Sequence, residues 1–575
     1  MRISMTRRAI AAVATAGLLL VGVPAAVTPA SAATACALGA TCEGNLEGSL
    51  GASPFKIVMP STFNGTVLIY NHGYRFSGPI PAAFAGPTAL GLSTNPAYTA
   101  ISVPAFATAF GSAVAYQANN MAQVAQNDKI AAGLLAQGYA LAGLGYSAQG
   151  WAIAEALQAN ENMIKYVNGG GVAGVKKIMV WGDSFGGYVS ATVAERNPGK
   201  VAGVLPTCAP LAGPEQAMQS AMTVMFTWKT LVAPTLRVAN YQSYTQALSD
   251  LATVLGTLGA VAAGTASTSS VGYPIPQANL LGGLMGGLPT KSSVYDGQTV
   301  NPMFATLGTA AGLAGGYSPA SAGASSAAAM LQNVGAAAAL GIMVRYDLEQ
   351  RARALGQIPA DQTANFTDNV GVTYTELLSS EQRGEFGDTL NATSVMPNAL
   401  NAMLAKLDES RGNAAARFPA NAAALKAVRS MPAPKGKYKV PTLLISTTFD
   451  PVVPAGNTEN YYLKLQKSGS GRMVKALQFY TIPPEDGWTT FDAGAKSPNA
   501  AASAAKATSG VGHCNWAIDN GIQMINAVTA LNRLVNAKTV KQIKAINRLM
   551  WSTPGVNSDG AFIPEPLKRP GLTVG

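Results

Sequence analysis

Between about residues 45 and 203, short apolar runs typical of buried β-strands alternate with segments that have helical spacing. The strand-like runs are Thr66–Tyr70, Tyr139–Leu144, Lys177–Trp181 and Val201–Leu205. The helical segments between them are Lys129–Gln137, Trp151–Val167 and Tyr188–Asn197. Because consecutive parallel strands need a crossover connection, this alternation predicts an α/β fold: a mostly parallel, twisted sheet with helices on both faces.

The alternation stops after residue 208. The segment 209–439 is rich in Ala and Gly, lacks strand-like runs, and has helical stretches at Ser325–Arg345 and Ala399–Leu407. We expect this segment to be a large, mainly helical insertion in the sheet domain. A separately packed second domain is the alternative interpretation.

Strand character returns in the last third of the chain, at Val440–Ser446 and Val474–Ile482. A long amphipathic helix is expected over Trp516–Asn536, and the basic residues after it are expected to form a loop-like tail without an assigned function. The predicted boundaries are therefore 33–208 and 440–536 for the core, 209–439 for the insertion and 537–575 for the tail.

The chain begins with the pattern of a secretory signal peptide, which we assign to residues 1–32. Three arginines precede the apolar run Ala9–Val23, and Ala30-Ser31-Ala32 matches a small-residue cleavage site. The run is too short to cross a membrane, and no later segment reaches about 18 uninterrupted apolar residues. We therefore expect an extracellular protein without a transmembrane segment in its mature form. The arginines leave both the Sec and the twin-arginine export routes open: Arg2, Arg7 and Arg8.

The composition excludes several classes of function. With 2 His and 4 Cys in 575 residues and no C-x-x-C pair, a structural zinc site lacks ligands, and no metal is expected. No G-x-x-x-x-G-K-[ST] sequence is present, so a phosphate-binding P-loop is not expected. The formal net charge of +11 falls to +8 without the three leader arginines, and no Lys/Arg cluster has interleaved aromatic residues. We therefore exclude nucleic-acid binding.

The sequence Gly182-Asp183-Ser184-Phe185-Gly186 lies directly after a strand-like run and directly before a helix. A G-x-S-x-G match alone is weak in a chain with 61 Gly, but a strand–turn–helix is the context in which this motif forms a nucleophile elbow. Glycines are needed in that turn because a side chain would crowd the neighbouring strand or helix. Ser184 is therefore the predicted nucleophile, with its hydroxyl near a helix N-terminus.

A serine hydroxyl needs a general base, and the chain offers only His72 and His513. His72 follows a strand well before the elbow, whereas His513 comes after all the strands, in a Gly-rich run. Position in the chain therefore favours His513 as the base. A surface histidine in a flexible loop is the alternative interpretation.

The base in turn needs an acid that orients its ring. Asp450 follows the strand Val440–Ser446 and precedes a proline that bends the chain away, which suits a carboxylate at a strand's carboxyl end. An ordinary turn aspartate before proline is the alternative. Asp486 and Asp492 lie nearer to His513 in sequence and are the reserve candidates.

The order nucleophile, acid, base along the chain resembles that of secreted bacterial α/β-hydrolases of the esterase and lipase type. The resemblance covers 45–208 and 440–536. It implies that the backbone N–H groups of Tyr74 and Phe185 form the oxyanion hole, that the helical insertion is a lid or cap after the sixth strand, and that no cofactor is needed. The residues that carry it are His72-Gly73-Tyr74, Gly182–Gly187, Asp450–Pro454 and Gly512-His513.

Export makes disulfides permissible, and four cysteines allow three pairings. Cys36 and Cys42 lie six residues apart and are able to close a small loop, which leaves Cys208 with Cys514. In the resembling family the His loop folds back over the strand ends, so a Cys208–Cys514 bond would tether that loop. Two buried thiols are the alternative for this second pair.

The resemblance implies hydrolysis of a carboxylic ester through an acyl-enzyme, with a small molecule, a lipid or a polymer as substrate. The apolar insertion favours an apolar acyl or alcohol group. We expect Leu280–Leu288 to be flexible, as a mobile lid edge or as ordinary packing. Tyr146 and Trp151 follow the end of a strand and are candidate pocket residues.

Two other classes of function stay open. A secreted peptidase of the aminopeptidase type could use the same three residues, but it would need carboxylates to hold a free amine. The candidates for that role do not cluster in the sequence: Glu155, Glu161 and Glu215. A non-catalytic binding protein on the same scaffold is less favoured because all three catalytic positions are occupied.

Overall fold

The protein is described from a computed structural model. The described residues are 35–84, 92–262, 265–287, 340–391, 396–447, 450, 452–469, 473–481, 513–514, 521–552, 562 and 564–567. The predicted signal peptide and the reserve acids Asp486 and Asp492 lie outside these ranges. Among the described residues, no helix is both long enough and apolar enough to cross a membrane.

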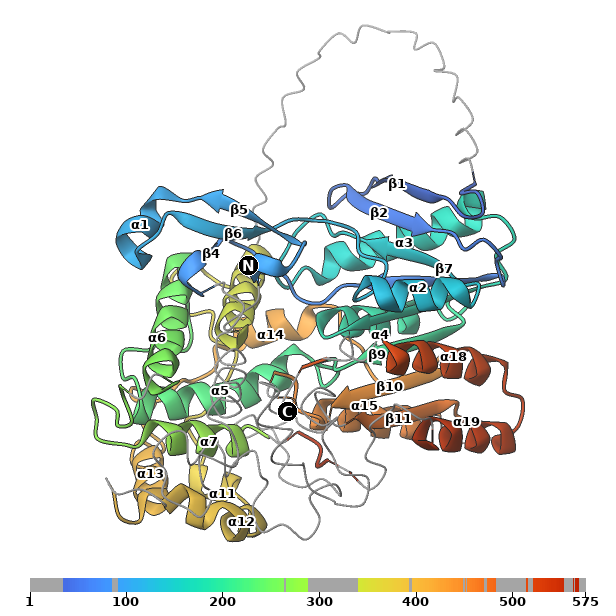
Figure 1. The fold of residues 1–575 in the computed structure, drawn as a ribbon. Coiled ribbons are helices and arrows are strands. Elements are labelled where there is room, and N and C mark those ends of the chain that lie inside the picture. Colours follow the sequence, from blue (N-terminus) through green and yellow to red (C-terminus); the bar gives the residue numbers. More distant parts are fainter. Residues whose placement is uncertain are drawn as a thin grey trace, which may run out of the picture.

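An eight-stranded sheet forms the centre of the molecule (Figure 1). Its spatial order is β1-β2-β7-β3-β8-β9-β10-β11; the pairings β1–β2 and β2–β7 are antiparallel and all the others are parallel. The strands are β1 (Thr41–Leu46), β2 (Ser53–Val58), β3 (Thr66–Asn71), β7 (Ala140–Leu144), β8 (Lys177–Asp183), β9 (Gly203–Thr207), β10 (Thr442–Thr447) and β11 (Ala476–Thr481).

Burial on both faces explains the sequence of the central strands. Every residue of β3, β7, β9 and β10 is buried, which is why these strands are almost continuously apolar rather than alternating. One face packs against α3 (Ile153–Tyr166) and α4 (Phe185–Arg196), and the other against α2 (Asp128–Ala136) and α18 (Ile522–Asn536). The strand order with helices on both faces is that of the α/β-hydrolase fold, as expected from the sequence.

The C-terminal segment differs from the loop that the sequence predicts. Residues Val540–Ser552 form α19, which packs against α18. Ile543, Ile546 and Met550 recur at helical spacing and are buried in the same apolar cluster as the sheet face. The basic residues between them concealed this apolar stripe in the sequence.

Helices make up the described elements of the segment 209–439. They are α5 (Pro214–Leu231), α6 (Tyr244–Ala262), α7 (Ile275–Met285), α11 (Tyr374–Leu377), α12 (Ser380–Asn391), α13 (Ala399–Asp408), α14 (Ala422–Ser430) and a helix over residues 340–354. Most of them share an apolar core of their own beside the sheet. The segment 325–339 of the predicted helix Ser325–Arg345 lies outside the described residues.

A second, small sheet was not predicted. Its three strands, β4 (Ile80–Pro81), β6 (Val114–Ala118) and β5 (Tyr98–Ser102), pair antiparallel, and α1 (Pro104–Phe110) connects two of them. In Figure 1 this sheet lies over α6, and its side chains pack against the core of the insertion. β4 has only two residues, and β5 and β6 are half exposed, so these strands lack the apolar runs that reveal the central strands.

Candidate active site

Ser184 lies at the junction of β8 and α4, with a backbone φ of +55° that non-glycine residues seldom adopt. A Cβ on Gly186 would lie 1.9 Å from the carbonyl oxygen of Asn71, and one on Gly182 would lie 2.4 Å from the same oxygen. Only glycine fits at either position. The turn therefore has the geometry of a nucleophile elbow.

The elbow is fixed by the end of the adjacent strand β9. The Ser184 N–H donates to the carbonyl of Thr207 at 2.8 Å, and the Ser184 carbonyl accepts from the Tyr188 N–H within α4 at 3.1 Å. Phe185 is buried and contacts the ring of Trp151, with 4.9 Å between ring centroids. Ser184 thus lies on a rigid turn between the sheet and α4.

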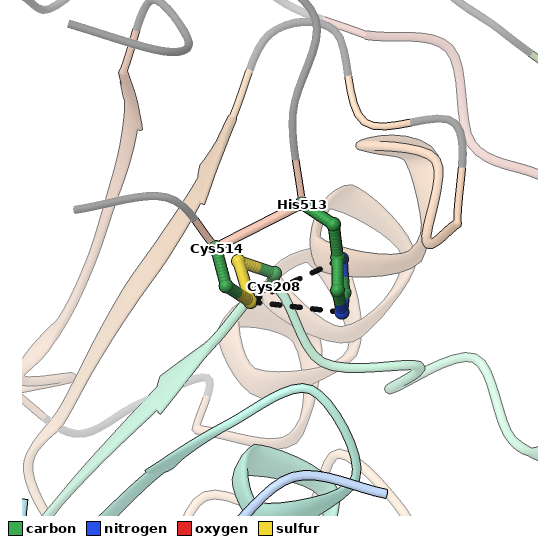
Figure 2. Close-up of side chains that lie close together, drawn as sticks. All are labelled: Cys208, His513 and Cys514. Carbon is green, nitrogen blue, oxygen red and sulfur yellow. Dashed lines mark hydrogen bonds between the residues drawn. A yellow bond between two sulfur atoms is a disulfide. The ribbon is translucent and has the colours of Figure 1, made fainter. Parts of the chain in front are cut away.

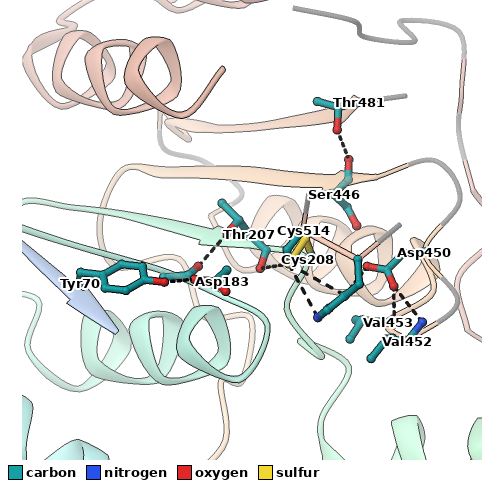
Figure 3. Close-up of a disulfide and its surroundings, with 12 residues drawn as sticks. Tyr70, Asp183, Thr207, Cys208, Ser446, Asp450, Val452, Val453, Thr481 and Cys514 are labelled. Atoms are coloured by element: carbon teal, nitrogen blue, oxygen red, sulfur yellow. Dashed lines mark hydrogen bonds and ion pairs between the residues drawn. A yellow bond between two sulfur atoms is a disulfide. The ribbon is translucent and has the colours of Figure 1, made fainter. Parts of the chain in front are cut away.

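His513 and Asp450, 63 residues apart in sequence, form a direct pair. His513 Nδ1 lies 2.7 Å from Asp450 Oδ2, and the other carboxylate oxygen accepts from the backbone N–H groups of Val452 and Val453 at 2.9 and 2.8 Å (Figure 3). Asp450 is fully buried, whereas the His513 side chain is 20% exposed. With Nδ1–H donating to Asp450, Nε2 is left as the free nitrogen of the ring.

The surroundings of His513 favour its protonated form. Burial by itself lowers the pKa of His513, but the charge of Asp450, the hydrogen bond to it and the charge of Asp183 outweigh burial and raise the pKa above 6.5. Asp183 precedes Ser184 and accepts a hydrogen bond from the Tyr70 hydroxyl. The sequence analysis gave Asp183 no role.

A disulfide fixes the position of the His513 loop. Cys514 is bonded to Cys208, the residue that follows β9, and Cys514 Sγ lies 3.8 Å from His513 Nε2 (Figure 2). Cys514 Sγ also lies 3.9 Å from the Thr207 carbonyl, the same carbonyl that accepts the Ser184 N–H. The Ser184 and His513 segments are therefore anchored at one point of the sheet edge.

The sulfur and imidazole groups of Cys208, His513 and Cys514 lie within 4.8 Å of one another. This cluster has the ligand types of a metal site, but its two sulfur atoms are bonded to each other and cannot act as thiolates. The other two cysteines, Cys36 and Cys42, also form a disulfide, so both pairs agree with the pairing that the sequence favoured.

His72 has a different environment from His513. It is buried, its Nδ1 lies 2.7 Å from the Gly73 carbonyl, and burial, followed by the charge of Arg75, lowers its pKa well below 6.5. The neighbouring Gly73 lies beside the elbow: a Cβ on it would be 3.7 Å from the Ser184 Cβ. This loop therefore runs along the nucleophile, where the sequence analysis expected the oxyanion loop.

Ser184 opens into an apolar pocket with about 1040 Å³ of empty space, counting the part that is open to solvent. Of the two aromatic residues expected there, Trp151 lines the pocket. Tyr146 is not among the residues that line it: its ring stacks on His72 at 4.2 Å, and its hydroxyl donates to the side chain of Asn71. Most of the pocket wall comes from the insertion and the loop after Asp450: Pro214, Ala217, Met218, Ser220, Ala221, Val224, Met225, Gly283, Gly286, Leu340, Gly341, Val344, Leu348, Val452, Val453, Pro454 and Asn457.

The run Leu280–Leu288 was predicted to be either a mobile lid edge or ordinary packing, and the structure describes it up to residue 287. Leu280–Met285 belongs to α7, every residue of which is buried, so this part agrees with ordinary packing. Gly282 and Gly286 allow α7 to approach α5 closely, since a Cβ on Gly286 would lie 2.7 Å from Val224. Leu567 also lines the pocket, so the C-terminal segment contributes to the site.

The pocket wall from the helix 340–354 was not predicted. Leu340, Val344 and Leu348 follow one another at helical spacing on one side of this helix, with Gly341 beside them. Their spacing was the available signal, but an apolar face in an Ala-rich insertion does not reveal whether it covers a core or a pocket.

The three glutamates considered for amine binding are all paired with arginines. They lie apart from one another, and none is among the residues that line the pocket. The pairs are Glu155–Arg351 at 3.1 Å, Glu161–Arg196 at 3.4 Å and Glu215–Arg429 at 2.6 Å.

Comparisons with known proteins found only distant likenesses, to solved structures of esterases. No family model and no curated protein matches the chain. An esterase from Pyrobaculum calidifontis has 10% sequence identity over 87% of this chain and 86% of that chain, with a TM-score of 0.30. The rice cell wall degrading esterase LipA from Xanthomonas oryzae has 13% identity over 76% and 81%, with a TM-score of 0.28.

A third similar structure is described as an arylesterase. It has 17% identity and a TM-score of 0.17, and the alignment covers 31% of this chain and 48% of that chain, about half its length. These likenesses are too distant to carry an argument about function. The α/β-hydrolase class rests on the strand order and the elbow geometry of this chain.

Proposed function

We propose that the protein is a secreted serine hydrolase that cleaves carboxylic esters, with Ser184 as nucleophile, His513 as general base and Asp450 as the acid that orients the base. One observation carries the proposal. The Thr207 carbonyl accepts the Ser184 N–H and lies 3.9 Å from Cys514, which adjoins the His513–Asp450 pair. Ser184 and the loop after Asp450 both line the apolar pocket, which supports a site at this edge of the sheet.

The reaction follows from the free nitrogen of the base. Ser184 Oγ attacks the ester carbonyl carbon while His513 Nε2 takes the serine proton, and the leaving alcohol then receives that proton. Water, deprotonated by His513, attacks the acyl-enzyme and releases the carboxylic acid and Ser184. Asp450 orients the ring and stabilises the imidazolium that forms in both halves of the reaction.

The backbone N–H groups of Tyr74 and Phe185 are the proposed oxyanion donors. Phe185 is the first residue of α4, so its N–H points out of a helix N-terminus, where negative charge is favoured. Tyr74 follows Gly73 in the loop beside Ser184 and lines the same pocket. Two donors from different segments would hold the oxygen that becomes negative during the attack.

The pocket supports a substrate with an apolar acyl or alcohol group. Its wall is made mostly of Ala, Val, Leu, Met and Gly, and the residues from α5 span Pro214 to Met225, about 16 Å at 1.5 Å per residue. A chain of methylene groups would gain about 0.8 kcal/mol for each group buried there.

A peptidase that trims free N-termini is not favoured. The three candidate glutamates pair with arginines, and none of them is among the residues that line the pocket. Secretion rests on the N-terminal leader pattern, and the two disulfides are compatible with an oxidising compartment.

A fluorophosphonate probe tests the central claim. The mature protein is expected to be labelled at Ser184, the variant Ser184→Ala to stay unlabelled, and Ser61→Ala, which changes an exposed serine, to be labelled normally. Turnover of p-nitrophenyl esters should exceed turnover of aminoacyl-nitroanilides. Absence of labelling would favour a binding protein, and a preference for the amides would favour a peptidase.

Separate substitutions test the acid. Asp450→Asn is expected to lower kcat by about 10⁴ because the base loses its orienting charge, whereas Asp486→Asn and Asp492→Asn should leave kcat near the wild-type value. Loss of turnover only in one of the latter two would assign the acid to that residue instead.

A further inference from the structure

A buried carboxylate of the insertion contacts the loop that carries the proposed oxyanion donor. Asp347, on the helix 340–354, accepts a hydrogen bond from the Tyr74 hydroxyl on one oxygen and from the Ser77 hydroxyl at 2.5 Å on the other. Asp347 is 4% exposed, and 273 residues separate it from Tyr74. Among the described residues, the hydrogen-bond partners of Asp347 do not include Ser184 or His513. The proposed mechanism therefore gives Asp347 no role.

The same carboxylate meets a third segment. The backbone N–H of Trp151, which lines the pocket, favours the charged form of Asp347, and Gly150 N–H donates to the Arg75 carbonyl at 2.8 Å. Gly150 has a φ of +77°, and a Cβ on it would lie 2.5 Å from Asp347 Oδ2. The side chains of Asp347 and Ser77 therefore approach residue 150 so closely that only glycine fits there.

Burying the carboxylate of Asp347 costs free energy, so its presence at a buried position calls for a reason other than packing. Among the described residues, no arginine or lysine forms an ion pair with Asp347. Arg351, one helical turn further along, pairs with Glu155 instead. Burial raises the pKa of Asp347 to about 6, although Ser77, Tyr74 and Arg351 favour the charged form. A neutral side chain would avoid this cost if the position served packing alone.

We propose that Asp347 is a positioning residue of the active site, which holds the Tyr74 backbone N–H in place through the Tyr74 and Ser77 hydroxyls. This inference rests on the proposed function, in which that N–H binds the oxyanion. The helix that forms one wall of the substrate pocket thereby also sets the geometry of the oxyanion hole. Small displacements are sufficient, because a shift of about 1 Å in catalytic geometry can cost about 100-fold in rate.

The test compares two pairs of variants. Tyr74→Phe removes the hydroxyl but keeps the backbone N–H, and Asp347→Asn keeps the shape of the side chain but removes its charge. The matched controls are Tyr241→Phe and Asp250→Asn, because Asp250 is another buried aspartate of the insertion. Asp250 accepts from the Tyr241 hydroxyl at 2.7 Å and from the backbone, away from the pocket lining.

Tyr74→Phe and Asp347→Asn are each expected to lower kcat for a p-nitrophenyl ester about tenfold, with KM within about twofold of wild type. The rate of labelling by a fluorophosphonate should fall by a similar factor, since that reaction also needs the oxyanion donors. The double variant should lose no more than either single one, because both remove the same contact. The control variants should keep the wild-type kcat.

The outcomes separate the two claims. If wild type neither turns over esters nor reacts with the probe, the proposed function fails and this inference fails with it. If wild type is active but Tyr74→Phe and Asp347→Asn keep kcat within twofold, the positioning role alone is wrong. It is also wrong if the control variants lose as much kcat as these two. Should Asp347→Asn not fold, Ser77→Ala replaces it, with a loss of kcat at constant KM expected and an unchanged kcat overturning the inference.

Discussion

At the scale of single residues, the proposed active site depends on two glycines, whose lack of a side chain allows a close approach of the backbone. Gly182 and Gly186 leave no space for a methyl group next to the Asn71 carbonyl, and this lets β8, the elbow and α4 meet at Ser184. The elbow is thus set by steric limits that any side chain would violate, rather than by an attractive contact.

Gly186→Ala is therefore expected to lower the free energy of unfolding by about 3 kcal/mol, because its Cβ would lie 1.9 Å from a backbone oxygen that has little freedom to move. Chemical denaturation measures the change. Gly256→Ala in α6 is the control: the methyl group there meets open space, so helix propensity should raise stability by about 0.5–1 kcal/mol. Equal effects of the two substitutions would contradict the steric account.

The pKa of His513 predicts how activity depends on pH. Only the neutral imidazole accepts the serine proton, so kcat/KM should fall as the pH drops through the raised pKa, with a midpoint above 6.5. In Asp450→Asn the charge that raises this pKa is gone, burial then dominates, and the midpoint should move to lower pH. The pH profile of probe labelling measures both midpoints, and an unchanged midpoint in the variant would contradict the assigned pair.

At the scale of helices and strands, α5 is the main wall of the substrate pocket. Small side chains such as Ala217 and Ala221 recur along the side of α5 that faces the pocket, and glycines of α7 and of the helix 340–354 complete the wall. The size of the side chains at a few positions on these helices therefore limits the length of the acyl or alcohol group that fits.

Filling the pocket should change specificity more than catalysis. Ala221→Phe is expected to lower kcat/KM for long-chain p-nitrophenyl esters at least tenfold and to leave the acetate ester within about twofold of wild type, because each excluded methylene group forfeits about 0.8 kcal/mol. Ala405→Phe, at an exposed position of α13, is the matched control. An equal loss for short and long esters would argue that the pocket does not bind the chain.

The helix 340–354 carries a stability cost that depends on pH. Burial raises the pKa of Asp347 from 3.8 to about 6, so the folded protein holds this proton more tightly than the unfolded chain does. Its contribution to the free energy of unfolding therefore decreases by about 2 kcal/mol as the pH rises from 4 to 8. Tyr98, Tyr244 and Tyr346 face the same carboxylate, and burial raises the pKa of each of them further above this pH range.

Asp347→Asn removes this titration. Between pH 4 and pH 8, the stability of the variant relative to wild type should shift by about 2 kcal/mol in favour of the variant, even though the variant loses activity. Urea denaturation at both pH values measures the shift. A difference that is the same at both pH values would show that Asp347 titrates normally in the folded protein.

At the scale of the whole molecule, the Cys208–Cys514 disulfide closes a loop with a sequence separation of 306, and the Cys36–Cys42 disulfide one of only 6. In the chain-entropy model these bonds restrict the unfolded chain by about 6 and about 2 kcal/mol. Only the Cys208–Cys514 bond lies beside His513, the proposed general base. Loss of this bond should therefore affect both stability and activity, whereas loss of the Cys36–Cys42 bond should affect stability alone.

Replacing both Cys208 and Cys514 by Ser is expected to lower the midpoint of thermal unfolding and, well below that midpoint, to lower kcat, because His513 loses its anchor. The matched variant, with Ser at positions 36 and 42, should lose less stability and keep kcat. Calorimetry and ester turnover measure the two effects. If the first variant keeps its full kcat, the disulfide does not position the base.

How much of this was readable from the sequence depends on how far each signal extends along the chain. The elbow and the central strands are encoded locally: Lys177–Trp181 was predicted and β8 ends at Asp183, two residues later. By contrast, Tyr74 and Asp347 are 273 residues apart in sequence. The residues around either of them form no sequence pattern that would predict this contact. Half-exposed strands such as β5 also carry too little apolar periodicity to be recognised.

The residues near the C-terminus have a consequence for how such an enzyme matures. Leu567 lines the pocket, its carbonyl accepts from Gln216 on α5, and the Glu565 carbonyl lies so close to Gly456 that a Cβ there would be 2.5 Å away. If the chain is exported as proposed, its hydrophobic cavity would be complete only after the segment around Leu567 had crossed the membrane. Proteolytic cleavage near residue 560 would leave Ser184 and His513 in place but remove Leu567 from the cavity wall, so the cavity would bind its ligand more weakly.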